Sequence, residues 1–162
     1  MFKEGAELEF DSKDVIIKGM GGRSKTRYRT TDPSMIVVAP DKRPNLPTVE
    51  VEFTLTEDDF NWILRCSNVL GSPNIGIESN GDVVSLTTFD VSDNSVHTNS
   101  VVLENVNANG QSYKLIFKSE NLKMLPGTYN VEISSKGIAK FVGESNGLVY
   151  YVTLETSSVY GV

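Results

Sequence analysis

The alternation of apolar and polar residues predicts mostly β-strands, interrupted by one long amphipathic helix. Residues 49–55 (VEVEFTL) alternate at every position, which is the pattern of a half-buried strand. Residues 56–70 follow at once, and there Phe60, Ile63 and Leu70 recur at helical spacing. A helix of this kind packs its apolar face against the core and exposes a polar stripe to solvent or to a ligand. The function of the protein depends on what that polar stripe contacts.

Both ends of this helix are marked by the residues around them. Thr56 and Asp59 have the spacing of a capping box, in which side chains accept hydrogen bonds from free backbone N–H groups of the first turn. Gly71 suits the left-handed conformation that ends a helix, and Pro73 prevents its continuation. The helix is therefore predicted to begin after Thr56 and to end at Leu70.

The chain after residue 48 contains the same order of elements twice: strand, helix, strand, strand, strand. The second helix is a short turn of residues 120–125, capped by Ser119 and ended by Pro126 and Gly127. Such a repeat predicts two helices on one face of antiparallel sheets. The elements are expected at 49–55, 56–70, 75–77, 83–91 and 97–104, and then at 113–118, 120–125, 129–133, 138–142 and 148–154.

The first part of the chain predicts three strands and no helix. Strands are expected at 6–10, 15–17 and 23–31, as in the end of a repeat whose opening strand and helix are absent. The stretch that follows contains three prolines in PDKRPNLP, which makes a semi-rigid connector. We therefore expect a partial N-terminal domain at 1–31, a connector at 32–48 and a complete domain at 49–162.

Composition narrows the classes of function. The formal net charge is −6 and the pI is near 4.8. Because nucleic acid is negatively charged, this charge disfavours a protein that binds nucleic acid with its whole surface. A local basic patch within an otherwise acidic surface remains compatible with it. The one cysteine, Cys66, allows no internal disulfide and fits a reducing cytosol. No run of residues reaches transmembrane length, and the acidic N-terminus does not resemble a signal peptide.

No catalytic, metal or cofactor site is recognisable in the sequence. His97 is the one histidine and has no second ligand at a recognised metal-binding spacing. Asp58 and Asp59 are explained by capping of the long helix. The glycines at 19–22 lack the Lys-Ser/Thr of a phosphate-binding loop. We therefore expect a protein that is not an enzyme.

Several blocks of residues, in one order and spacing, resemble the DNA polymerase sliding clamps of T-even-type bacteriophages. None of these blocks is a catalytic signature. They are Asp32-Pro33-Ser34 with Val37-Val38-Ala39-Pro40, Ile63-Leu64-Arg65, Leu122-Lys123-Met124 with Pro126-Gly127 and Tyr129, Gly137 with Ala139-Lys140-Phe141 and Gly143-Glu144, and Val149 to Glu155.

The resemblance implies an α+β DNA clamp fold, with antiparallel sheets outside and helices lining the inner face. It also implies a processivity factor: three subunits form a ring around duplex DNA, an ATP-driven clamp loader opens the ring, and the DNA polymerase is tethered by its C-terminal peptide. Clamps of this type also serve late transcription, in the cytoplasm of a phage-infected bacterium. By comparison with this family, we expect the chain to lack the first repeat unit and the second helix of the N-terminal domain.

The resemblance also points to site residues. The polar stripe of the long helix would face DNA phosphates, with Arg65 as the best contact beside Asn61 and Asn68; Lys118 and Lys123 are expected to act in the same way. The competing interpretation is that Arg65 is simply a solvated helix residue.

A pocket for the partner peptide is expected near the connector. Family position assigns it to Tyr28, Val37, Val38 and Pro40, although these residues could instead close the core beneath the connector. The alternative function for the whole chain is a non-catalytic, all-β phage structural or interaction module. Such a module would self-assemble without a polymerase peptide or a loader.

Overall fold

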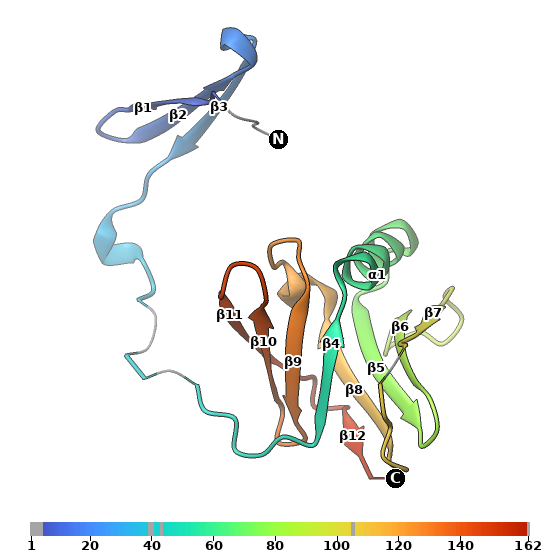
Figure 1. Cartoon of the computed structure of the whole chain (residues 1–162). Coiled ribbons are helices and arrows are strands. Elements are labelled where there is room, and N and C mark those ends of the chain that lie inside the picture. Colours follow the sequence, from blue (N-terminus) through green and yellow to red (C-terminus); the bar gives the residue numbers. More distant parts are fainter. Residues whose placement is uncertain (1–4, 39–40, 43, 105, 162) are drawn as a thin grey trace. The chain divides into compact units, whose positions relative to one another are not determined.

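The computed structural model describes residues 5–38, 41–42, 44–104 and 106–161 of the chain. The chain divides into two compact units, residues 1–43 and 44–162 (Figure 1). The division falls within residues 32–48, the stretch in which the sequence predicts a connector. Each unit is described by itself below.

The first unit contains a three-stranded antiparallel sheet. Its strands are β1 (Glu7–Phe10), β2 (Asp14–Gly19) and β3 (Ser24–Arg29), in the order β1-β2-β3. The three strands predicted here are therefore confirmed. Two 3-10 turns, η1 (Met20–Gly22) and η2 (Pro33–Met35), follow β2 and β3 respectively.

The second unit contains the repeat that the sequence predicts. The first copy consists of β4 (Val51–Leu55), α1 (Glu57–Leu70), β5 (Asn74–Asn80), β6 (Val84–Phe89) and β7 (Asn99–Val102). The second consists of β8 (Ser112–Lys118), η3 (Ser119–Leu122), β9 (Tyr129–Ser134), β10 (Ile138–Gly143) and β11 (Val149–Thr153), followed by β12 (Val159–Tyr160).

The two copies of the repeat exchange their first strands. One sheet has the order β11-β10-β9-β4 and the other β12-β8-β5-β6-β7, so β4 pairs with β9 and β8 pairs with β5. Phe53 of β4 lies opposite Val131, and Leu115 of β8 lies opposite Ile77. Because each sheet needs a strand from the other copy, the two copies form one folding unit.

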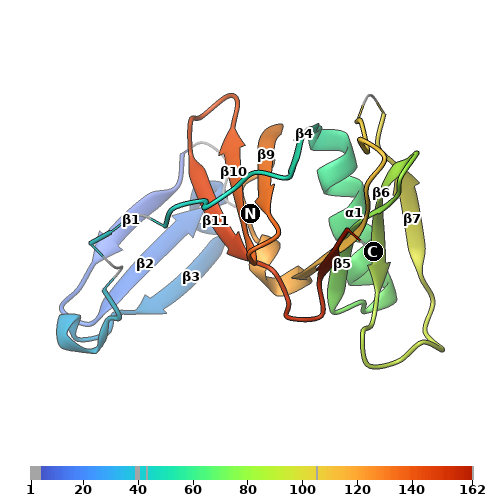
Figure 2. The ribbon, with the colours of Figure 1, turned by 90° about the horizontal axis from the view of Figure 1, so that it is seen from below.

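One apolar core joins the two sheets and the helix. Phe60 and Ile63 on α1 are each 1% exposed and belong to the same buried cluster as Val131 on β9 and Leu115 on β8. Figure 2 shows α1 lying against β5 and β6, and it contacts both strands. The helix therefore covers the inner face of the five-stranded sheet.

The predicted ends of α1 are confirmed. The Oγ1 of Thr56 accepts a hydrogen bond from the Asp59 N–H at 3.2 Å and donates one to Asp59 Oδ2 at 2.7 Å. In a capping box the side chain at position 59 would accept from the Thr56 N–H, whereas here the Asp59 carboxylate accepts from the Thr56 hydroxyl. At the other end Gly71 has a φ of 67°, in the left-handed region.

The second predicted element, a short helical turn at 120–125, is present only in part. The chain forms the four-residue 3-10 turn η3, so α1 is the one α-helix among the described residues. Ser119 is not a cap but the first residue of η3, and the preceding Lys118 makes no capping hydrogen bond with its side chain. Leu122 and Met124 are both buried, whereas Lys123 between them is exposed. That alternation is incompatible with continuing a helix up to Pro126.

The strand β12 was not predicted. Val159 and Tyr160 pair with Lys114 and Tyr113 of β8, and so extend the five-stranded sheet. Two hydrogen bonds hold the segment before β12: Glu155 N–H donates to the Ile116 carbonyl at 2.7 Å, and Ile116 N–H donates to the Ser158 hydroxyl at 2.9 Å.

Within the described residues, no helix has the length and apolar character that crossing a membrane would require.

Candidate nucleic-acid interface

The polar side of α1 points away from the core. Asn61, Arg65 and Asn68 are spaced by four and three residues, so they lie on one face of the helix. Asn61 is half-buried, whereas Arg65 and Asn68 are exposed. The structure therefore brings these three predicted site residues together.

The segment around η3 belongs to the same layer as α1. In the order of the repeat η3 occupies the position of α1, and its Leu122 enters the shared core. The Glu57 N–H at the start of α1 donates to Thr128 Oγ1 at 3.3 Å, which links the helix to the loop that follows η3. Lys123 is exposed between two buried neighbours and so lies on the solvent side of this layer. We call α1 together with residues 119–124 the helical layer.

The helical layer is electrostatically mixed. Its two predicted cationic contacts are Arg65 and Lys123, and no salt bridge engages either of them within the described part of the chain. The first turn of α1 carries Glu57, Asp58 and Asp59, where the helix dipole stabilises negative charge. An anionic ligand would therefore meet few cations and would be repelled near the start of the helix.

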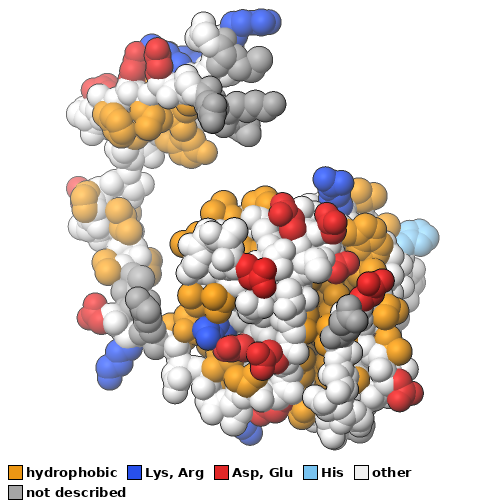
Figure 3. All heavy atoms as spheres, in the orientation of Figure 1, with side chains coloured by type: hydrophobic (Ala, Val, Ile, Leu, Met, Phe, Trp, Pro, Cys, Tyr) orange, Lys and Arg blue, Asp and Glu red, His pale blue; other side chains and the backbone are white. Residues whose placement is uncertain are grey.

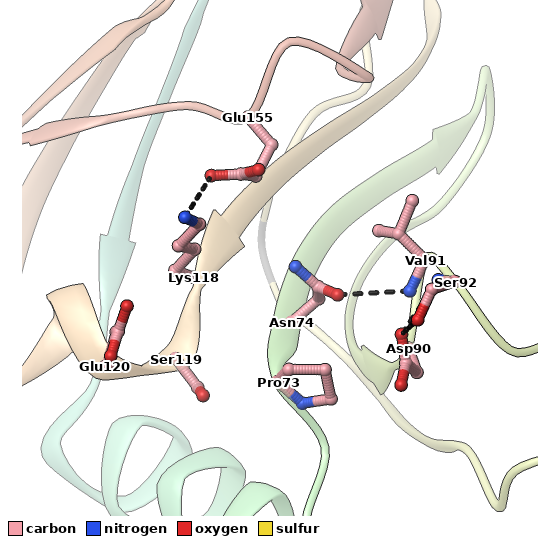
Figure 4. Close-up of a pocket in the computed structure, with 9 residues that line it drawn as sticks. All are labelled: Pro73, Asn74, Asp90, Val91, Ser92, Lys118, Ser119, Glu120 and Glu155. Atoms are coloured by element: carbon pink, nitrogen blue, oxygen red, sulfur yellow. Dashed lines mark hydrogen bonds and ion pairs between the residues drawn. The ribbon is translucent and has the colours of Figure 1, made fainter.

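Lys118 does not join this layer. It follows the buried Phe117 in β8, and successive side chains of a strand point to opposite faces of the sheet, so Lys118 lies on the face away from α1. There its Nζ is 3.9 Å from Glu155 Oε1. Figure 4 shows these two side chains facing each other. They belong to a hollow of about 480 Å³, which is lined by Pro73, Asn74, Asp90, Val91, Ser92, Lys118, Ser119, Glu120 and Glu155. The structure thus separates Lys118 from Arg65.

Three of the four residues predicted to bind a partner peptide are described, and these three lie in the first unit. Val37 is 96% exposed and Val38 is 80% exposed, in the chain after η2. Tyr28, 60% exposed, lies instead on the β1-β2-β3 sheet, where its register partner is Val15. Pro40 lies outside the described residues. A nearby hollow is lined by residues 12–13 and 29–33, and none of these is one of the predicted pocket residues.

Two features of the site were missed by the sequence analysis. The acidic first turn was read as a cap, although its charges also weaken any attraction of the helical layer for anions. The bond from Glu57 to Thr128 joins residues 71 positions apart, and no local pattern could indicate it. Among the described residues, no group of three or more His, Cys, Asp or Glu side chains is placed to hold a metal ion.

Comparisons with protein sequences give consistent matches. A family model described as gp45 sliding clamp, C-terminal, matches residues 52–156. The sliding clamp of Vibrio phage KVP40 is 30% identical over 157 residues, which cover 94% of this chain and 69% of that protein. The sliding clamp of Enterobacteria phage T4 is 29% identical over 166 residues, covering 99% of this chain and 71% of that protein.

Comparisons with solved structures show the fold. A structure titled "C-terminal region of FEN-1 bound to A. fulgidus PCNA" matches 95% of this chain with a TM-score of 0.51 and 15% identity. An H. pylori beta clamp matches 96% with a TM-score of 0.54 and 14% identity, and a PCNA2–PCNA3 complex from Sulfolobus tokodaii matches 93% with a TM-score of 0.54 and 16% identity. This chain spans 65%, 43% and 64% of those chains, respectively. The architecture is the DNA clamp fold.

Proposed function

The chain belongs to the gp45 sliding-clamp family, and we propose that it forms part of a ring that encircles duplex DNA and tethers the replicative DNA polymerase. The observation that carries the proposal is the helical layer. Asn61, Arg65 and Asn68 share one solvent face of α1, and Lys123 is exposed in the segment that takes the place of a second helix. These residues form the DNA-facing surface in this proposal. Lys118 is left out because it lies on the other face of its sheet.

The sparse positive charge of this surface suits a sliding ring. Each phosphate contact contributes a slope of about −0.9 to the dependence of log affinity on log salt concentration. With Arg65 and Lys123 as its cations, the surface would give a slope of about −2 per subunit. So few phosphate contacts make DNA binding weak, which leaves the protein free to slide. The closed ring then keeps the protein on the DNA.

The partners follow from the same proposal. The polymerase would be held by its C-terminal peptide, an ATP-driven loader would open the ring, and the chain would act as a homo-oligomer in the cytoplasm of an infected bacterium. We assign the peptide contact to Val37 and Val38, because apolar side chains exposed to 96% and 80% can be covered by an apolar peptide. The family resemblance makes that oligomer a trimer.

A polymerase assay tests the proposal. A T4-type phage polymerase with its loader would extend a primed circular template with and without this chain, and product length after a single encounter would be measured. We expect longer products with the chain, shorter ones with Arg65→Glu, and no change with Lys118→Glu, which makes the same charge change on the other face. Equal product lengths with and without the chain would contradict tethering.

A further inference from the structure

The second unit contains three Asn-Gly pairs, and each lies at a turn of the chain. They are Asn80-Gly81 at the end of β5, Asn109-Gly110 before β8 and Asn146-Gly147 between β10 and β11. An asparagine loses its side-chain amide most readily when glycine follows it, because glycine has no side chain to hinder attack by its backbone nitrogen on the carboxamide carbon. The sequence alone therefore marks three sites of the same reactivity, and only the fold distinguishes them.

The first pair is held by hydrogen bonds at both of its reacting groups. The Oδ1 of Asn80 accepts from the backbone N–H groups of Asp82 and Val83, both at 3.0 Å. The Gly81 N–H, which carries the nitrogen that would attack, donates to Ser79 Oγ at 3.0 Å. The carboxamide of Asn80 can therefore meet this nitrogen only after these bonds break.

The last pair is held in the same way. The Oδ1 of Asn146 accepts from the Leu148 N–H at 2.9 Å, and the Gly147 N–H donates to the Gly143 carbonyl at 2.9 Å. The carboxamide of Asn146 also packs so closely on Gly143 that a Cβ at that glycine would collide with it. Both reacting groups of this pair are thus fixed by the fold.

The middle pair has neither restraint. Asn109 and Gly110 have φ values of 54° and 68°, and they are the central residues of a turn that the Gln111 N–H closes by donating to the Ala108 carbonyl at 2.9 Å. Within the described residues, no hydrogen bond engages the Asn109 carboxamide or the Gly110 N–H. Both residues are also exposed to water, the second reactant.

We propose that Asn109 is a site of spontaneous deamidation, which in the folded chain reacts faster than the other two Asn-Gly pairs. The Gly110 nitrogen gives up its proton and bonds to Asn109 Cγ, the Cγ–Nδ2 bond breaks, and the side-chain nitrogen leaves as ammonia. Water then opens the resulting five-membered succinimide at either of its carbonyl carbons, which leaves aspartate or isoaspartate at position 109. No electrons are transferred to or from another molecule. The proposal goes beyond DNA tethering and does not rest on it.

The product adds negative charge to an acidic part of the molecule. Asn109 lines a hollow of about 550 Å³ together with Glu50 and Glu52. Acidic residues outnumber basic ones in the second unit, and Figure 3 shows Asp and Glu side chains spread over its visible face. The isoaspartate product also lengthens the backbone of a two-residue turn by one methylene group. Because the modified chain is more acidic than the original, anion exchange separates the two.

The experiment follows all three pairs in the folded and in the denatured chain. The whole chain is kept in neutral buffer for several weeks at a fixed temperature, beside a sample in guanidinium chloride. Cleavage after glutamate places the pairs in separate peptides, 79–104, 105–120 and 145–155. Mass spectrometry measures the gain in mass when a carboxyl group replaces an amide, and fragmentation of each peptide identifies the residue that changed.

In the folded chain, Asn109 should deamidate at least about tenfold faster than Asn80 and Asn146, because those two must first lose hydrogen bonds at both reacting groups. In guanidinium chloride the three rates should agree within about threefold, since the fold no longer distinguishes the pairs. Asn109→Gln keeps an amide but requires a six-membered ring, so it should abolish the mass gain in peptide 105–120. Asn94→Gln, in the loop between β6 and β7, is the matched control and should leave that gain unchanged.

Equal rates at the three pairs in the folded chain overturn the proposal. It is also overturned if the denatured chain reacts while the folded chain gains no mass at Asn109, because the fold would then protect this pair as well. A mass gain in peptide 105–120 that Asn109→Gln does not remove has the same consequence. The comparison of folded and denatured wild-type chain needs no variant, so it stands even if a substitution disturbs the turn.

Discussion

The ring of Phe60 on α1 packs edge-to-face against the ring of Tyr129 on β9, with 5.6 Å between the ring centroids. The contact joins the helix of the first repeat to a strand of the second. Tyr129 is fully buried, packs against Phe141 as well, and donates a hydrogen bond from its hydroxyl to the Leu125 carbonyl. The helical layer and both sheets therefore share one core and are expected to unfold together.

Phe60→Ala should lower the free energy of unfolding of the second unit by about 3–5 kcal/mol, because it removes a buried aromatic ring and leaves a cavity. Urea denaturation followed by circular dichroism measures this effect. Tyr129→Phe keeps the ring and removes one hydrogen bond, so its cost should be nearer 1 kcal/mol. If Phe60→Ala melted α1 while β9 to β11 kept their amide-exchange protection, the shared core would be refuted.

Gly76→Ala should also destabilise the second unit, through a different mechanism. A Cβ at Gly76 on β5 would lie 2.7 Å from Thr87 Oγ1 and 2.8 Å from Phe89 Cε1, on the outer face of the five-stranded sheet. The ring of Phe89 is held there by Lys114, whose Nζ lies 4.0 Å from its centroid. We expect a loss of about 1–3 kcal/mol in thermal or urea unfolding. Ser85→Ala on the neighbouring β6 is the control, and equal stability of the two variants would contradict this account.

The first unit should lose stability in acid. The hydrogen bond from Arg27 to Asp14, 2.5 Å long, lowers the pKa of the Asp14 carboxyl below 3.8, against the opposing effect of burial, and the charges of Arg27 and Arg29 lower it further. Because the folded-state pKa is the lower one, the stabilisation is fully present above the unfolded-state value near 3.8 and is lost as the pH falls through the folded-state value.

Amide exchange in β2 and β3 can follow this loss by NMR between about pH 6 and pH 3. The wild-type chain should lose protection as the pH falls below about 4. Asp14→Asn should start with weaker protection at neutral pH and show a smaller change in acid. An unchanged pH profile in Asp14→Asn would show that another group controls acid sensitivity.

Arg65→Gln should reduce the salt dependence of DNA binding and leave the free energy of unfolding nearly unchanged. Removing one phosphate contact lowers the magnitude of the slope of log affinity against log salt by about 0.9 per subunit. Fluorescence anisotropy with a labelled duplex at several salt concentrations measures the slope. Lys118→Gln, on the opposite face of its sheet, should leave the slope unchanged; an equal effect of both substitutions would contradict the assigned surface.

Local patterns predicted most elements of the fold. Thr56, Asp59 and Gly71 fixed the ends of α1 because capping is a local interaction. The turn at Asn80 and Gly81 was also predictable, and the Asn80 side chain accepts from the N–H groups of Asp82 and Val83. These features need only residues close in sequence.

Features that depend on distant residues were not predictable. The exchange of β4 and β8 between sheets leaves no local trace, because the alternation of VEVEFTL is the same whichever strand pairs with it. The spacing of residues 120–125 suggested a helical turn up to Leu125, but Leu122 and Met124 are both buried in the shared core and the 3-10 turn ends at Leu122. For the same reason the sequence grouped Lys118 with Arg65, although the sheet places it on the other face.

Retention on DNA with open or blocked ends tests the sliding-clamp proposal most directly. A ring can thread onto a linear duplex from a free end without a loader, so a high concentration of the chain would be incubated with biotinylated duplex whose ends are blocked by streptavidin either before or after protein addition. The proposal predicts protein that survives a high-salt wash only when the ends are blocked afterwards, since retention is then topological. Equal amounts bound in both orders, removed alike by salt, would show ordinary surface binding and contradict a ring around DNA.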